Sequence, residues 1–405
     1  MKKILLISSI YPGPDVPSNY TPVVHYFARE WVKMGLDIRV IHTSNYFPYL
    51  YYLLPKSLKN YISSKKGFAL PEKRLNKCIT FYLDNVKIHR TPMKKIIPGK
   101  NFSKFVIKKA IKDILSFLKS EEFTPDYIIG HWVIPQAELL SILKQFFNCP
   151  IALTLHDGGQ AFHYYKNYQQ LINSIDIWGY RSENIKQSFE ANYGVRKNTF
   201  KCYSGIPEAY LKNVPFRSFK KIDKFIYVGM LIERKHPDKV ITAINQAYRN
   251  TTYHLSIIGE GGMKKELQGM IRNLHIEHQV DLLGKRSRTE VMSHLDESDV
   301  FIMISEHEVF GLVYIEAMAR GCIVVASIGE GMQGIITNGV NGFLCKSGDT
   351  NDLIRILNII RSLSVPERQQ ISYEAQKTAK KLTDKKVAEN YISTIMQLGN
   401  TLPKS

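Results

Sequence analysis

The chain has 405 residues and a formal net charge of +19, with 44% hydrophobic and 22% charged residues. This length exceeds the size at which one hydrophobic core stops growing, so we expect two domains, and the composition excludes a disordered or fibrous protein. The five cysteines are far apart and never spaced Cys-x-x-Cys, which argues against a disulfide framework or a zinc knuckle. No segment approaches the roughly 18 uncharged apolar residues of a membrane span, and the first apolar run breaks at Ser8-Ser9, which favours a buried strand over a secretion signal. We therefore expect a cytoplasmic protein.

Short apolar strands alternate with amphipathic helices along the first half of the chain. The predicted strands are 4–7, 37–41, 86–91, 127–129, 151–155, 175–178 and 199–203, and the predicted helices are 22–34, 102–118, 135–146 and 183–192. A second alternation starts at Phe225, and the proline- and lysine-containing stretch 207–224 is predicted to be the linker. This pattern predicts an α/β fold with two doubly wound, Rossmann-like domains of parallel sheet, covering 1–205 and 206–383.

Positive charge is concentrated in one segment. Residues 56–119 carry 17 basic and 3 acidic side chains, and the aromatic stretch 46–54 precedes them. Tyrosines and leucines beside lysines suit the headgroup layer of an anionic membrane, where each cation contributes about 1 kcal/mol. We interpret 56–119 as a peripheral contact with the inner face of the membrane. The alternative is that the lysines lie on ordinary solvated surface and the tyrosines pack inside. No nucleic acid partner is expected, because no recognised binding motif accompanies the charge.

Two histidines of the first domain follow predicted strands directly. His131 is followed by Trp132, and His156 by Asp157. Open α/β sheets bind ligands at the carboxyl ends of their strands, and histidine can hydrogen-bond or move a proton near neutral pH. We therefore take both histidines as candidate catalytic residues and Trp132 and Asp157 as candidate acceptor contacts. Gly13, in the turn after the first strand, is a third candidate acceptor contact. A purely structural role remains the alternative for each histidine.

A dinucleotide-binding oxidoreductase would share this architecture, and its glycine fingerprint is absent. The turn after the first strand offers only Gly13, and the run starting Gly259-Glu260-Gly261 has Lys264 at the third glycine position. We interpret Gly259 and Gly261 as part of a loop close to a ligand. An ordinary turn is the alternative.

In the second half, two carboxylates flank a glycine where a loop is predicted to become a helix. Glu308 precedes Gly311, Glu316 follows it, and the helix over 312–320 ends at Gly321. The first amides of a helix can receive a diphosphate, a glycine lets it come close, and carboxylates accept hydrogen bonds from sugar hydroxyls. These features predict a nucleotide-sugar site. The alternative is that Glu316 is a helix-surface charge and Glu308 a partner of the helix dipole.

From Phe225 to Asp349 the chain resembles the nucleotide-sugar half of the family 4 retaining glycosyltransferases. The matching segments are Phe225-Ile-Tyr-Val-Gly229, Ser256-Ile-Ile-Gly259, Val280-Asp-Leu-Leu-Gly284, Ser298-Asp-Val-Phe-Ile302, Glu316-Ala-Met-Ala319 and Asn341-Gly-Phe-Leu344. The resemblance implies the GT-B fold, in which two Rossmann-like domains face each other across a cleft and a last helix, about 384–405, returns to the first domain. It also implies retaining transfer from a nucleotide diphosphate sugar, UDP before GDP, to a glycan or lipid-linked acceptor in capsule, O-antigen or exopolysaccharide assembly.

The resemblance also implies roles for individual residues. Glu308 would contact the donor sugar, Glu316 the ribose and Lys235 the diphosphate. The family often has arginine where this chain has Met230, and Arg234 is the candidate to supply that charge. The further donor-binding candidates are Gly229, Gly259, Gly261, Phe310, Gly311, Leu312, Lys285 and Arg286. In the first domain the His131 and His156 segments resemble the acceptor side of the family, whereas Asn19-Tyr20-Thr21-Pro22 replaces the usual glycines.

The chain contains no Asp-x-Asp pair, so neither a divalent metal nor another cofactor is expected for the transfer. The charge of the leaving group would be met by Lys235, by Arg234 and by the amides that begin at Gly311. Two other functions stay open. One is a nucleotide-sugar epimerase or phosphorylase on the same fold, and the other is a non-catalytic polyanion- or membrane-binding protein that uses 56–119.

Overall fold

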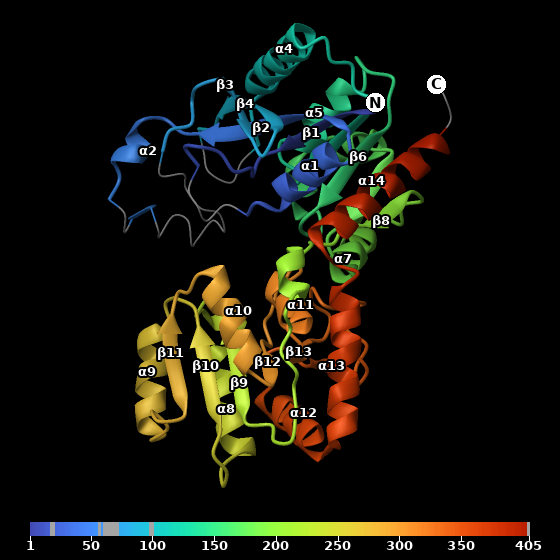
Figure 1. Ribbon diagram of the computed structural model, residues 1–405. Helices are drawn as coiled ribbons and strands as arrows, with labels where there is room; N and C mark the ends of the chain where they lie inside the picture. The colour runs from blue at the N-terminus through green and yellow to red at the C-terminus, as the bar shows by residue number, and fades with distance from the viewer. Residues whose placement is uncertain (17–20, 56–57, 60–72, 97–100, 403–405) are drawn as a thin grey trace. The chain divides into compact units, whose positions relative to one another are not determined.

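The computed structural model describes residues 1–16, 21–55, 58–59, 73–96 and 101–402, which form two compact units (Figure 1). Unit 1 comprises Met1–Arg181, Ile185–Cys202 and Val387–Ser405, and unit 2 comprises Ser182–Asn184 and Tyr203–Lys386. Each unit is an α/β structure built on one sheet, as the sequence predicts. No helix in the described part of the chain has the length and apolar character needed to cross a bilayer.

Unit 1 contains an eight-stranded sheet in the order β3-β4-β2-β1-β5-β6-β7-β8. Its strands are β1 (Lys3–Ser8), β2 (Asp37–Tyr46), β3 (Ile79–Leu83), β4 (Val86–Lys94), β5 (Tyr127–His131), β6 (Ile151–Leu155), β7 (Ile177–Tyr180) and β8 (Thr199–Lys201). All neighbouring pairs are parallel except β3 and β4. The sequence analysis missed β3. Its signal is the two-residue turn Asp84-Asn85, in which both residues have positive φ, as tight hairpin turns require.

The helices of unit 1 are α1 (Val23–Lys33), α2 (Leu50–Leu53), α4 (Lys104–Ser120), α5 (Gln136–Leu143), α6 (Tyr168–Asn173), most of α7 (Glu183–Tyr193) and most of α14 (Asp384–Asn400), with a short 3-10 helix η1 (Gln160–Tyr164). The last helix, α14, packs on α1. The indole nitrogen of Trp31 donates to the carbonyl of Ala388 at 2.8 Å, and the Tyr391 ring meets Phe27 and Trp31 edge-on. The C-terminal helix thus returns to the first domain, as the fold class predicts.

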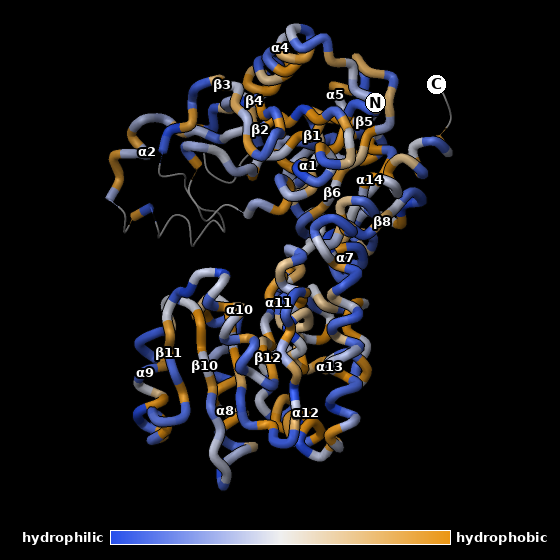
Figure 2. Tube along the Cα trace, in the orientation of Figure 1, coloured by the Kyte–Doolittle hydropathy of each residue, from blue (hydrophilic) through white to orange (hydrophobic). Residues whose placement is uncertain are grey.

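Unit 2 contains a six-stranded, fully parallel sheet in the order β11-β10-β9-β12-β13-β14. Its strands are β9 (Lys224–Val228), β10 (His254–Ile258), β11 (Val280–Gly284), β12 (Val300–Ile302), β13 (Ile323–Ser327) and β14 (Phe343–Cys345). Its helices are η2 (Glu208–Leu211), η3 (Glu233–Lys235), α8 (Pro237–Ala247), α9 (Lys264–Asn273), α10 (Arg288–Glu297), α11 (Leu312–Ala319), α12 (Thr350–Ser362) and α13 (Val365–Ala379). Figure 2 shows hydrophobic residues along the central strands and mixed hydropathy along the helices, as expected when helices cover a buried parallel sheet.

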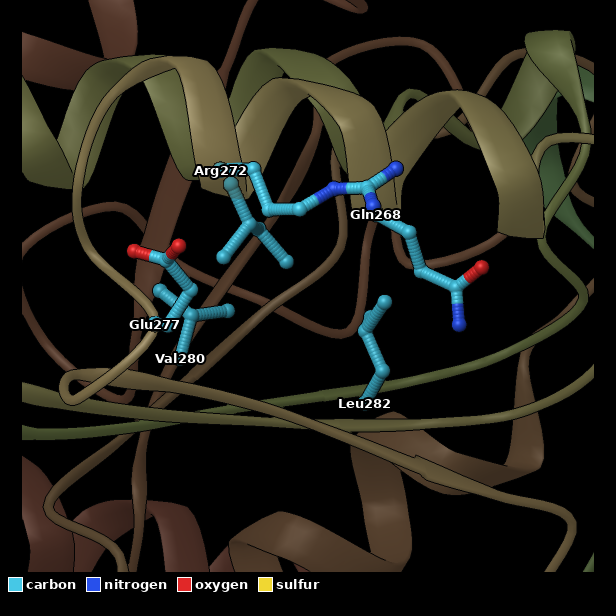
Figure 3. A pocket seen from close by; sticks show the side chains of 6 residues that line it. Gln268, Arg272, Glu277, Val280 and Leu282 are labelled. Carbon is cyan, nitrogen blue, oxygen red and sulfur yellow. The ribbon is translucent and has the colours of Figure 1, made fainter.

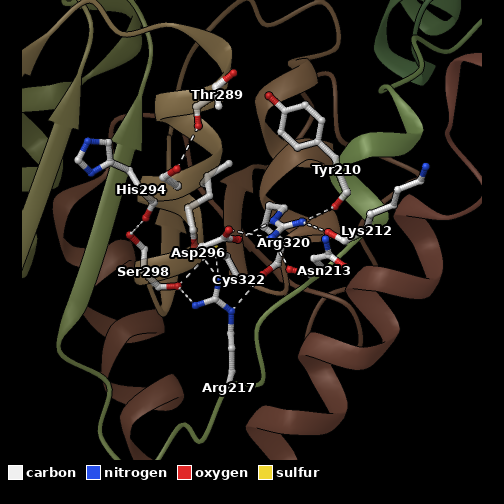
Figure 4. Close-up of polar contacts among 12 residues, drawn as sticks. Tyr210, Lys212, Asn213, Arg217, Thr289, His294, Asp296, Ser298, Arg320 and Cys322 are labelled. Carbon is white, nitrogen blue, oxygen red and sulfur yellow. Dashed lines mark hydrogen bonds and ion pairs between the residues drawn. The ribbon is translucent and has the colours of Figure 1, made fainter.

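The segment 207–224 is an integral part of unit 2, so its prediction as a linker was wrong. The Arg217 guanidinium donates to the carbonyl of Arg320 at 2.8 Å, and Arg320 in turn donates to the carbonyls of Tyr210 and Lys212 at 3.1 and 2.7 Å (Figure 4). The linker was predicted because prolines and lysines are typical of loops. This composition does not reveal guanidinium contacts between residues about a hundred positions apart. These contacts fix the segment against α11.

Candidate functional site

The predicted donor residues of unit 2 lie at one edge of its sheet. Gly229 follows β9, Gly259 follows β10, Lys285 follows β11 and Glu308 follows β12. The four strands are neighbours and run parallel, so their carboxyl ends meet at the same edge. This is the edge at which open α/β sheets bind their ligands.

Glycines allow the loops at this edge to touch through their main chains. Gly259 donates to the carbonyl of Gly284 at 2.9 Å, and Gly229 donates to the carbonyl of Ile258 at 3.0 Å. Gly259 has a φ of +151°, and a Cβ there would collide with the carbonyl oxygen of Gly229. A Cβ on Gly261 would collide with the carbonyl of Leu231 in the same way. Both glycines are therefore required by the close approach of two strand-end loops.

Two predicted catalytic residues, Lys235 and Glu308, are in direct contact. Lys235 lies in η3, is 7% exposed, and its Nζ forms an ion pair with Oε2 of Glu308. The main-chain amide of Glu308 donates to Oε2 of Glu330 at 2.7 Å. The sequence analysis did not identify Glu330, which holds the loop that carries Glu308. An ammonium and a carboxylate are thus held together at the edge of the sheet, where each could exchange its partner for a ligand group.

Helix α11 starts and ends at the predicted glycines. Gly311 is its N-cap residue with φ +77°, and Gly321 follows its end with φ +78°. A Cβ at Gly311 would lie 2.5 Å from the ring of Tyr314, so only glycine fits there. Phe310 is buried and stacks on Tyr203 with 5.6 Å between ring centroids. Leu312 is partly exposed as the first helical residue.

Glu316 faces the interior of unit 2 and is paired with a residue that the sequence analysis missed. It is 7% exposed, and its Oε1 accepts a hydrogen bond from Nη2 of Arg288 at 3.0 Å. Burial raises the pKa of Glu316, while the Arg288 guanidinium acts in the opposite direction. The alternative of an ordinary helix-surface charge is therefore wrong. The sequence offers one signal near Arg288. Ser287 and Glu290 form a capping box, which marks Arg288 as the first residue of α10.

The other predicted cations have different surroundings. Nη1 of Arg234 donates to the carbonyl of Glu306 at 3.1 Å, so Arg234 holds the loop after β12. Lys285 is exposed, and Arg286 lies 3.9 Å from the carboxylate of Glu290. Met230, where the resembled family often has arginine, is half-exposed. Whether Arg234 also meets a diphosphate stays a prediction.

The two predicted histidines of unit 1 belong to one polar chain, which is buried at His131 and partly exposed at His156. Nδ1 of His131 lies 2.9 Å from Nε2 of His156, and Nε2 of His131 lies 3.1 Å from the hydroxyl of Tyr391, which contacts Thr154 at 2.7 Å. Burial lowers the pKa of both histidines, and the positive charge of Arg181 adds to the effect. Both rings are therefore neutral at physiological pH. The sequence analysis did not identify Tyr391, because it lies 260 residues from His131.

His131 and His156 differ in access. His131 is fully buried, and both of its ring nitrogens are engaged, so it lies behind His156; its part in the transfer stays a prediction. His156 is partly exposed, and its ring stacks on Trp132 at a centroid distance of 3.8 Å. Asp157 accepts a hydrogen bond from the amide of Gly159 at 2.8 Å. The ligand-facing candidates of this cluster are therefore Trp132, His156 and Asp157.

Gly13 lies beside a buried arginine that the sequence analysis did not identify. A Cβ on Gly13 would come within 3.1 Å of Nη2 of Arg90. Arg90 is 1% exposed and pairs with Asp15 at 3.1 Å, and within the described ranges its Nε and Nη2 atoms have no hydrogen-bond partner. His42 lies opposite Arg90 in the sheet register, and burial together with the Arg90 charge lowers its pKa to about 3. Asn19 and Tyr20, from the same predicted loop, lie outside the described residues.

A surface pocket of about 340 Å³ lies between α9 and β11, away from the predicted donor residues (Figure 3). It is lined by Gln268, Ile271, Arg272, Glu277, Val280 and Leu282. Val280 is the first residue of β11, whereas the predicted donor residues follow the carboxyl ends of the strands. We therefore assign this pocket no part in the candidate site.

Comparisons with known proteins agree with this architecture. A sequence model of the family described as Glycosyl transferases group 1 matches residues 213–378. An uncharacterized glycosyltransferase of Methanocaldococcus jannaschii is 28% identical over 287 residues, which cover 69% of this chain and 76% of that protein. TuaC of Bacillus subtilis, a putative teichuronic acid biosynthesis glycosyltransferase, is 23% identical over 341 residues, covering 80% of each chain.

The fold is also that of solved glycosyltransferase structures. The structure of HepE from Anabaena, in complex with UDP, superimposes with a TM-score of 0.65 at 17% identity and covers 98% of this chain and 100% of that one. The family match lies on unit 2, which carries the glycine loops and the ion pair of Lys235 with Glu308. The match to the group 1 glycosyltransferases thus covers most of unit 2, and the chain has the GT-B fold of solved glycosyltransferases.

Proposed function

We propose that this enzyme transfers a sugar with retention of configuration from a nucleotide diphosphate sugar, UDP-linked before GDP-linked, to a glycan or lipid-linked glycan. The observation that carries the proposal is the contact of Lys235 with Glu308 beside the glycine loops at the sheet edge of unit 2. The UDP complex of the similar HepE structure supports UDP, and the likeness to TuaC supports cell-surface polysaccharide assembly. Capsule, O-antigen and exopolysaccharide assembly all require this class of reaction.

In this proposal, binding of the donor breaks the ion pair between Lys235 and Glu308. The diphosphate draws Nζ of Lys235 away from Glu308, and the Glu308 carboxylate then accepts hydrogen bonds from the hydroxyls of the sugar. The amides at the start of α11, next to Gly311, face the diphosphate and meet the negative charge that develops on the leaving group. Glu316, held by Arg288, accepts from the ribose. Both carboxylates bind hydroxyls, so neither acts as a glycosidase acid or nucleophile.

Unit 1 would bind the acceptor. Trp132 and His156 offer an aromatic face with a neutral imidazole, which suits a sugar ring and its hydroxyls. Among the residues that the structure describes, two nitrogens of Arg90 beside Gly13 have no hydrogen-bond partner, which suits a phosphate of a lipid-linked acceptor. We expect Arg90→Gln to raise the KM for a lipid-pyrophosphate acceptor while the KM for the donor stays unchanged. A change in donor KM alone would contradict this assignment.

We also propose that the basic segment 56–119 holds the enzyme at the inner face of an anionic membrane. Residues 56–57, 60–72 and 97–100 of this segment lie outside the described residues. Just before it, Tyr49, Leu50 and Leu53 around α2 are 62%, 74% and 63% exposed, whereas Phe47 is buried, so only part of the aromatic stretch is open to a membrane. Flotation should recover the protein with anionic vesicles and leave it behind with zwitterionic ones. Equal, negligible recovery with both would refute the membrane contact.

Activity can be tested with a panel of UDP-, GDP- and ADP-sugars and lipid-linked acceptors, with mass spectrometry of the products. A product heavier than the acceptor by one sugar is the expected result. An altered nucleotide sugar without transfer would indicate an epimerase instead. Thermal unfolding with each free nucleotide separates the non-catalytic alternative, because a ligand at 100 times its Kd stabilises the folded state by about 2.7 kcal/mol. No shift with any nucleotide would favour a polyanion-binding protein.

A further inference from the structure

Three side chains with metal-binding chemistry meet at the outer edge of the sheet in unit 1. Cys78 precedes β3, His89 lies on β4 and Asp113 lies on α4. Sγ of Cys78 is 3.3 Å from Nε2 of His89 and 3.2 Å from Oδ1 of Asp113, and Nε2 of His89 is 3.2 Å from Oδ2 of Asp113. All three ligand atoms lie within 4.8 Å of one another. None of these residues has a part in the proposed transfer.

We propose that Cys78, His89 and Asp113 bind one divalent transition-metal ion, zinc by preference, with water as the fourth ligand. Zinc bonds of about 2.3 Å to sulfur and about 2.0–2.1 Å to nitrogen and oxygen place tetrahedral ligands roughly 3.3–3.6 Å apart, close to the separations present here. A thiolate with an imidazole selects zinc over magnesium or calcium, which prefer oxygen ligands. Cys78 is exposed, which leaves the fourth position open to solvent.

The surrounding contacts hold the three ligands in the orientation that a metal requires. Nδ1 of His89 lies 2.9 Å from the hydroxyl of Thr80, which suits the tautomer that donates from Nδ1 and leaves the Nε2 lone pair directed at Cys78 and Asp113. The hydroxyl of Thr91 donates to Oδ2 of Asp113 at 2.7 Å. The His89 ring stacks on Phe117 of α4, with centroids 4.2 Å apart and planes 12° apart. Ligands with such supporting contacts are typical of built metal sites.

Without an ion, the three side chains form a hydrogen-bonded cluster, in which the Cys78 thiol donates to Asp113. Metal binding forms the Sγ–metal bond and releases the thiol proton to solvent, so about one proton should leave for each ion bound.

A bound ion would join three elements of unit 1. It would connect the start of β3 to β4 and to α4. Among the described strands, β3 is the terminal strand of the sheet, and its partner is β4. A two-stranded hairpin is only marginally stable alone, so a metal ion that links β3 and β4 to α4 would stabilise it. The expected role is structural and is independent of sugar transfer.

The test uses the full chain, purified without a metal-binding tag. Elemental analysis should find one zinc per chain, and Co²⁺ added to the zinc-free protein should give thiolate-to-cobalt charge-transfer absorption. Cys78→Ser should abolish that absorption, and Asp113→Asn should weaken zinc binding at least tenfold. Cys149→Ser is the matched control, because Cys149 is another cysteine of unit 1 whose pKa burial raises to about 12, and it should leave metal binding unchanged.

Stability provides a second measurement that does not depend on the spectrum. Zinc should raise the Tm of the wild-type and Cys149→Ser proteins and leave that of Cys78→Ser unchanged. Equal circular dichroism spectra and equal UDP binding would show that the variants are folded and that unit 2 is intact. Absence of both zinc and cobalt binding, or cobalt absorption that survives Cys78→Ser, would show that the three side chains form a hydrogen-bonded cluster without a metal. Either result would overturn the proposal.

Discussion

In unit 2 the carboxyl ends of the parallel strands carry glycine loops and one ion pair, whereas in unit 1 the histidines at the ends of β5 and β6 form a polar chain with Tyr391 of α14. At the proposed donor edge main-chain atoms approach each other closely, as between Gly229 and Gly259. At the proposed acceptor edge polar side chains such as His131 depend on distant partners such as Tyr391. The donor edge should therefore be sensitive to added Cβ atoms and lost charges, and the acceptor edge to acid and to lost hydroxyls.

The largest effect should come from the ion pair at the donor edge. We expect Lys235→Met or Glu308→Gln to lower the rate of sugar transfer by about 10²–10³-fold, the range seen when one preorganised electrostatic contact is removed from an active site. Steady-state kinetics with a competent donor would measure it. Lys239→Met, which removes a partly exposed lysine from α8, is the control and should keep the wild-type rate. Near-normal turnover by either site variant would contradict the assignment.

Next in size should be the cost of a methyl group at the glycine loops. Gly259→Ala is expected to lose about 1–3 kcal/mol of stability, because its φ is unfavourable for alanine and the Cβ collides with Gly229. In the neighbouring Gly262→Ala the Cβ meets nothing within 4 Å, so the change should stay within about 0.5 kcal/mol. Urea unfolding would compare the two. Similar losses in both variants would show that the close approach of the loops is not what requires Gly259.

In unit 1 the comparison predicts that acid lowers the folding stability, because His42 is buried in its neutral form. Its pKa is about 3 in the folded chain and about 6.5 in the unfolded chain, so the unfolded state binds more protons between these values. The stability that depends on neutral His42 is present above pH 6.5 and is lost as the pH falls, by up to about 1.4 kcal/mol per pH unit. Urea unfolding of the wild type and His42→Gln at pH 7 and pH 5 should show a smaller acid loss in the variant. Parallel losses would disprove the contribution of His42.

The smallest expected effect is that of the Tyr391 hydroxyl. Tyr391→Phe removes its contacts with Thr154 and His131 and should cost about 1 kcal/mol, the net value of a typical hydrogen bond. Tyr373→Phe changes an exposed tyrosine of α13 and should have no measurable effect. Thermal unfolding of both variants would measure the difference. A Tyr391→Phe protein as stable as the wild type would mean that the buried chain does not depend on this hydroxyl.

Local signals predicted most strands and helices of unit 1, although not β3, α2 or α6, and they located the start and end of α11 at Gly311 and Gly321. They did not reveal partners that the fold brings together from distant positions. Arg288 reaches Glu316 across 28 residues, and Arg217 reaches Arg320 across 103. Side-chain pairs of this kind follow no period or spacing, so sequence reasoning found one member at most and misread the segment around Arg217 as a linker.

The proposed donor site of unit 2 is tested most directly by hydrogen–deuterium exchange of the full chain with and without saturating UDP. We predict slower exchange in peptides that contain Gly229–Lys235, Gly259–Met263 and the start of α11, with no change in β3 and β4 of unit 1. Lys235→Met should reduce this protection at the same UDP concentration. Protection confined to unit 1, or no protection at a UDP concentration that inhibits sugar transfer, would contradict the placement of the nucleotide at the carboxyl ends of these strands.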